Sequence, residues 1–189
     1  MQHEAGKNGG PRRPLAFVTI GPAPRDDVVP EILQMVGRPV EPVEYGALDG
    51  LTAEEIAAQQ PSDEESSLYT RLTSGDQVVV SMPFIEARLA PLMQRLDRGG
   101  LDLIVLVTTG VRRGFPTRAP LLNGERLVDA WAEALVVDHG RIGLIYPLQR
   151  QIVERRYVHS HGTVIREAKA SAFSGNDESL AAAAGRLTA

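Results

Sequence analysis

Residues Leu15–Ile20 form the stretch that most constrains the fold, because their sequence, LAFVTI, is an almost continuous apolar run. A run without polar alternation is typical of a strand buried on both faces, as in parallel sheets. Gly21 follows at once and permits a sharp turn, and Pro24 has the fixed φ that suits the first turn of a helix. This order predicts an α/β protein, in which ligands bind beyond the carboxyl ends of the strands.

Arg25 lies in this turn, and the sequence leaves two roles open for it. With the free backbone N–H groups at the start of a helix, its guanidinium would hold a small anion. Alternatively, Arg25 pairs with Asp26 or Asp27 on a solvated helix end.

Two later apolar runs resemble the first. Asp102–Val107 ends in Thr108-Thr109-Gly110, and Ile142–Tyr146 ends at Pro147. Helical and strand patterns alternate with these runs, as α/β folds require. Strands are also predicted at 40–47 and 163–167, and a hairpin pairs 68–72 with 77–81.

The helices are predicted from apolar spacing and from their ends. They cover residues 28–36, 52–59, 82–98, 123–139, 148–157 and 177–186. Thr52 and Glu55 form a capping box, and Pro61 stops that short helix. In the helix 82–98, one face carries Ile85, Leu89, Leu92, Met93 and Leu96.

The segment 112–122 contains Arg112, Arg113 and Arg118 among Pro and Gly residues, and it is predicted to be an irregular connector. Asn123 then caps the next helix, which places Leu127, Trp131, Ala134 and Leu135 toward a core. Arg112 and Arg113 are interpreted as solvated arginines, with gating or anion recognition as the alternative. His159 and His161 are interpreted as surface residues rather than metal ligands.

Composition excludes several classes of protein. The 189 residues have a formal net charge of −4 and no basic stripe, so a nucleic-acid partner is not expected. The absence of Cys excludes disulfides within these residues and fits a cytoplasmic location. No apolar run is long enough to cross a membrane, and residues 1–13 are predicted to be a flexible tail. No nucleotide-binding glycine motif is present, and neither cofactor nor metal is expected.

Taken together, the sequence resembles the AroM family. The resemblance rests on Thr19-Ile-Gly21-x-x-Pro24-Arg25-x-Asp27, on Tyr45-Gly-Ala-Leu-Asp-Gly-Leu-Thr52 and on the turn after Leu72. It continues through Asp102–Thr109 and His139–Pro147, and it spans about residues 15–186.

The resemblance implies the fold of the aspartate/glutamate racemase superfamily, with two Rossmann-like α/β lobes and a cleft between them. Residues 14–122 would form the first lobe, and residues 123–189 an incomplete second lobe. Such racemases carry one cysteine in each lobe, and Thr108 corresponds to the first. The family's remaining cysteine belongs to an Asp-Cys-(apolar)-Gly stretch that is not in this sequence. We therefore expect no two-cysteine racemisation, because a threonine hydroxyl is too weakly acidic to replace a thiol unaided.

These considerations predict a carboxylate site at the strand ends, whose residues are Thr19, Gly21, Arg25, Thr108, Thr109, Gly110 and Tyr146. The alternative is that the threonines merely satisfy strand-end backbone groups. Two function classes remain open: an isomerase-like or decarboxylase-like enzyme acting on a small carboxylic acid, and a non-catalytic protein that senses a carboxylate metabolite or is an inactive fragment. An incomplete second lobe would expose a sheet edge and favour self-association, so a homo-oligomer is also anticipated.

Overall fold

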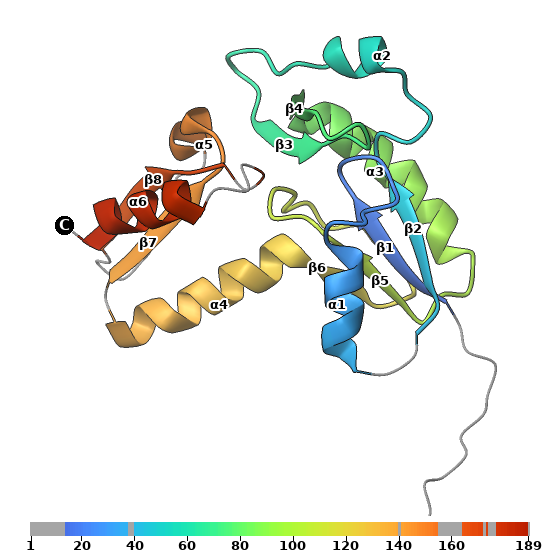
Figure 1. The fold of residues 1–189 in the computed structure, drawn as a ribbon. Coiled ribbons are helices and arrows are strands. Elements are labelled where there is room, and N and C mark those ends of the chain that lie inside the picture. The colour runs from blue at the N-terminus through green and yellow to red at the C-terminus, as the bar shows by residue number, and fades with distance from the viewer. Residues whose placement is uncertain are drawn as a thin grey trace, which may run out of the picture.

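A parallel four-stranded sheet forms the centre of the protein, with the strand order β2-β1-β5-β6 (Figure 1). The structure is a computed structural model that describes residues 14–37, 40–139, 141–154, 164–171, 173 and 177–188. The strands of this sheet are β1 (Leu15–Thr19), β2 (Pro42–Gly46), β5 (Leu103–Leu106) and β6 (Leu121–Asn123). β1 pairs with both β2 and β5, so the two most apolar runs of the first half lie side by side, which confirms the α/β prediction.

The helices of the first half are α1 (Val29–Val36), α2 (Ala53–Ala57) and α3 (Met82–Asp97). In α3, all five predicted apolar positions are buried, and they form one core with the sheet residues Ala16, Val18 and Ile104. The capping box of Thr52 and Glu55 at the start of α2 is present as predicted. Among the described residues, no helix combines the length and the apolar character that crossing a membrane requires.

The predicted hairpin is present as a separate two-stranded sheet of β3 (Ser67–Arg71) and β4 (Gln77–Ser81). Its turn is closed by the Leu72 N–H, which donates to the Asp76 carbonyl at 2.8 Å. Gly75 has a φ of 94°, a conformation that glycine adopts without strain.

The C-terminal segment consists of β7 (Arg141–Tyr146), α5 (Gln149–Glu154), β8 (Val164–Lys169) and α6 (Asp177–Thr188). β7 and β8 pair in parallel and form a third sheet. The long helix α4 (Gly124–His139) connects β6 to this segment, and Figure 1 shows it running from the central sheet toward β7.

The structure corrects three local predictions. Pro24 does not lie in the first turn of a helix, because residues 26–28 form a turn and the N–H groups of Val28 and Val29 donate to the Arg25 carbonyl. The helix begins at Val29, one residue from its predicted start, and Pro30 occupies its first turn. The connector 112–122 ends in a strand, since Leu121–Asn123 pairs with β5.

The third correction concerns α4, whose apolar residues were predicted to face a core. Leu127, Trp131 and Leu135 are instead 50%, 67% and 38% exposed, and Ala134 is exposed as well. Helical spacing identified an apolar stripe correctly, but none of the described elements covers it.

Candidate functional site

A cavity of about 300 Å³ lies at the carboxyl ends of β1, β5 and β7. Ile20 follows β1, Thr108, Thr109 and Gly110 follow β5, and Tyr146 ends β7, and all five residues line the cavity. Leu68 and Tyr69 of the hairpin form another part of the wall. Four of the residues predicted for the carboxylate site are therefore brought together: Thr108, Thr109, Gly110 and Tyr146.

Helix α4 contributes two carboxylates to the wall of this cavity, Glu125 and Asp129. Glu125 is only 4% exposed, and its Oε1 accepts a hydrogen bond of 3.1 Å from Arg112 Nε. Arg112 Nη2 also donates to Asp129 Oδ1 at 3.1 Å. Arg112 thus bridges the two carboxylates and fixes their side chains, while its own side chain is exposed to solvent, as the sequence predicted.

The start of α4 is held directly against the end of β5. Asn123 caps the helix by accepting from the Arg126 N–H at 3.3 Å, and its Nδ2 donates to the Val111 carbonyl at 3.0 Å. A Cβ on Gly124 would lie 2.8 Å from the Thr108 carbonyl oxygen. Only glycine allows this approach, which places Glu125 beside the residues that follow β5.

Arg25 lies in a different place from Thr108 and Thr109. It lines a second pocket of about 280 Å³ with Arg71 and the hairpin turn, whereas Thr108 and Thr109 line the first cavity. Its Nε and Nη2 donate to Asp27 at 2.7 and 2.9 Å, so the ion-pair alternative with Asp27 is the one observed. The hydrogen bond from Arg25 lowers the pKa of Asp27 below its ordinary value.

Thr19 and Gly21 are buried and line neither pocket. Thr19 Oγ1 accepts from the Gly21 N–H at 3.3 Å and from Arg25 Nη1 at 3.1 Å. Thr19 therefore forms hydrogen bonds with groups at the end of β1, which is the alternative to ligand binding that the sequence analysis left open for the threonines.

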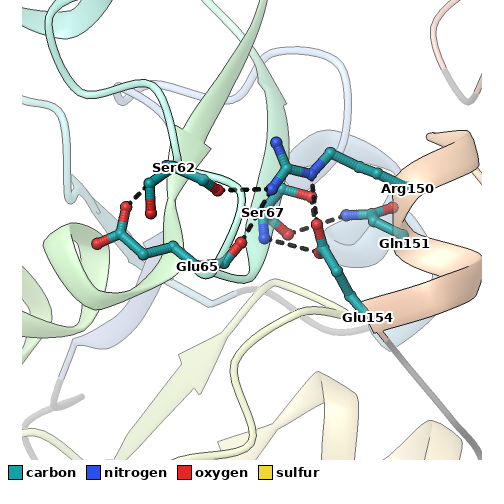
Figure 2. A network of polar contacts seen from close by, with 6 residues as sticks. All are labelled: Ser62, Glu65, Ser67, Arg150, Gln151 and Glu154. Carbon is teal, nitrogen blue, oxygen red and sulfur yellow. Dashed lines mark hydrogen bonds and ion pairs between the residues drawn. The ribbon is translucent and has the colours of Figure 1, made fainter.

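Helix α5 supplies a further wall residue, Gln151, which is 3% exposed. Its Nε2 donates to the Ser67 carbonyl at 3.0 Å, and the neighbouring Glu154 accepts from Ser67 as well (Figure 2). Sequence analysis missed Gln151, Glu125 and Asp129. The only signal for Gln151 was its place in the first turn after the Tyr146-Pro147 strand end.

Arg113, His159 and His161 were also considered as site residues from the sequence. Arg113 lies 3.7 Å from Glu86 and over the Phe115 ring, away from the cavity wall. His159 and His161 lie outside the described residues.

Comparison with known families gives a match along nearly the whole chain. The protein-family model described as AroM protein matches residues 15–189. Neither the curated proteins nor the solved structures yield a match to this chain. The chain therefore belongs to the AroM family.

Proposed function

We propose that this protein binds a small carboxylic acid in the cavity at the ends of β1, β5 and β7. The observation that carries the proposal is the convergence of Thr108, Thr109, Gly110 and Tyr146 on one cavity of about 300 Å³. Hydroxyl and backbone N–H groups are the donors that a carboxylate accepts from. In this proposal, the cavity is the cleft between two lobes of the aspartate/glutamate racemase type.

Titration of the ¹⁵N-labelled protein with maleate, malate and aspartate, followed by NMR, tests the proposal. We expect the amide signals of Thr108, Thr109 and Gly110 to shift. Thr109→Val should weaken binding about threefold to tenfold, because a neutral hydrogen bond contributes roughly 0.5–1.5 kcal/mol. Shifts confined to residues outside the cavity, or no shifts at all, would refute the proposed site.

The same titration decides whether Arg25 belongs to the site. If Arg25 held the ligand, it would contribute more than Thr109, since hydrogen bonds to charged groups contribute about 1.5–3 kcal/mol. Its place in the second pocket instead favours a small effect of Arg25→Ala on ligands of the first cavity. A loss larger than that of Thr109→Val would show that the ligand reaches across both pockets.

An enzymatic role is the second candidate, and the position of Glu125 favours it. A buried carboxylate in the cavity provides a base that Thr108 lacks, within a site that would bind the substrate's own carboxylate. Glu125 would take a proton from the carbon beside that carboxylate and return one to it. In D₂O, this reaction would replace the carbon-bound hydrogen of malate or aspartate by deuterium, and Glu125→Gln should abolish the exchange. Binding without exchange would favour the non-catalytic metabolite sensor.

A further inference from the structure

Helix α5 is joined to the hairpin and to the loop just before it by one network of polar contacts, which we call the α5 clasp (Figure 2). It consists of Arg150, Gln151 and Glu154 of α5, together with Ser62, Glu65 and Ser67. Glu154 Oε2 accepts from both the N–H and the Oγ of Ser67, at 2.8 Å each. Arg150 Nη2 donates to the carbonyls of Ser62 and Glu65 at 2.9 and 3.0 Å.

The charge of Glu154 is central to the clasp. Its side chain is 13% exposed, and Arg150 pairs with it from the preceding turn of α5. Burial raises the pKa of Glu154, but the hydrogen bonds from Ser67 and Arg150 outweigh this effect, and the pKa lies below its ordinary value. The carboxylate of Glu154 is therefore ionised in the clasp, because the contacts with Ser67 and with Arg150 both favour the charged form.

The apolar cores on the two sides of the clasp are separate. One core contains buried residues from Ala16 to Phe115, and the other contains Ala168, Ala170 and Ala183. Among the described residues, no buried apolar cluster joins the C-terminal segment to the central sheet. Tyr69 adds a smaller contact, with its ring 5.2 Å from that of Phe173 and its hydroxyl 3.2 Å from Ser171 Oγ. Polar interfaces of this kind permit relative motion, because separation exposes little apolar area to water.

Closing the clasp also has a cost. Because Gln151 Nε2 donates to the Ser67 carbonyl, the amide orientation is fixed and Oε1 points to the other side. That oxygen is buried and has no hydrogen-bond partner among the described residues. A buried acceptor without a partner is unfavourable, and separation from Ser67 would allow water to reach it. This free-energy penalty partly offsets the stabilisation of the clasp by the hydrogen bonds of Glu154 and Arg150.

We infer that the α5 clasp is a releasable latch that controls the opening of the cavity. The hairpin carries Ser67 next to the wall residues Leu68 and Tyr69, and α5 carries Glu154 one turn from the wall residue Gln151. Separation of α5 from the hairpin must therefore widen the cavity between them. This inference goes beyond the proposed function and does not rest on it, since it concerns the two walls and not the ligand.

The absence of cysteine makes the latch directly measurable with spin labels. Gln94 on α3 and Ala182 on α6 are exposed helical positions, and Gln94→Cys with Ala182→Cys would report the distance between the two parts. Electron–electron double resonance would compare this labelled protein with versions that also carry Glu154→Ala or Ser67→Ala. We expect Glu154→Ala to add a population at longer distance, and Ser67→Ala, which keeps the backbone donor, to add a smaller one.

Glu167→Ala is the matched control, because Glu167 is an exposed glutamate on β8 of the same segment. It should leave the distance distribution unchanged. Hydrogen exchange of the β7 and β8 amides distinguishes opening from unfolding, and their protection should persist in Glu154→Ala. An unchanged distance distribution in Glu154→Ala would overturn the latch. Loss of β7 and β8 protection in that variant would also overturn it, since the clasp would then be part of the folding of the segment.

Discussion

Gly124→Ala is the substitution that most directly tests the contact between α4 and β5. The new Cβ would lie 2.8 Å from the Thr108 carbonyl oxygen and 3.2 Å from that of Leu106, and neither backbone atom can move independently of β5. Overpacking of this kind costs about 1–3 kcal/mol, whereas replacing a helical glycine by alanine gains about 0.5–1 kcal/mol. We therefore expect a net loss of up to about 2.5 kcal/mol, which lowers the Tm by up to roughly 10 °C in a protein of this size.

Gly185→Ala provides the control, because it is the same exchange in a helix where the added methyl meets open space. Apart from the nearby backbone of its own helix, no heavy atom of the described residues lies within 4 Å of a Cβ built on Gly185 in α6. The gain in helix propensity should raise the Tm by roughly 1–4 °C. Circular dichroism of the two variants during heating gives both shifts. If Gly124→Ala also raised the Tm, the close approach of α4 to Thr108 would be refuted.

Three further outcomes follow from individual side chains. Trp131 is the only tryptophan and is 67% exposed, so its fluorescence should have the emission maximum of a hydrated indole and be quenched readily by iodide; a blue-shifted, unquenched emission would show that the α4 stripe is covered. Thr52→Ala should destabilise the protein by about 0.5–2 kcal/mol in urea unfolding, because Thr52 caps α2 and Glu55 bonds back to it; Thr73→Ala, in the exposed hairpin turn, is the control. The hydrogen bond from Arg25 lowers the pKa of Asp27 in the folded protein. The ion pair therefore stabilises the protein at pH values above the ordinary aspartate pKa of about 3.9, and this stabilisation is lost as the pH falls through the lower pKa of the folded state. Asp27→Asn should reduce the loss of stability between pH 5 and pH 2 in acid unfolding curves.

The parts of the fold that were predicted correctly depend on patterns within one element. An apolar run predicts a buried strand whatever surrounds it, and β1 and β5 are found where LAFVTI and DLIVLV stand. The face of α3 is correct for the same reason, because five apolar residues at helical spacing stabilise a helix only when they are buried together. Turn chemistry and the capping box are likewise local.

Predictions that required knowledge of neighbouring elements were less successful. The spacing of Leu127, Trp131 and Leu135 reveals a stripe on α4, but it contains no information about what packs on that stripe. Arg25 had two chemically reasonable partners, an anion and an adjacent aspartate, and only the geometry identifies Asp27.

The failure to predict Glu125 as a residue of the cavity has one cause, which is the strand β6. Ligand sites were sought beyond strand ends, and this rule found Thr108, Thr109, Gly110 and Tyr146 because their strands are long apolar runs. Three residues, Leu121–Asn123, are too few to show a strand pattern, and their pairing with β5 is a tertiary interaction. Once they are known to form a strand of the same parallel sheet, the same rule points to the residues after Asn123. The next two are Gly124, which allows the close approach to Thr108, and Glu125, the buried carboxylate of the cavity wall.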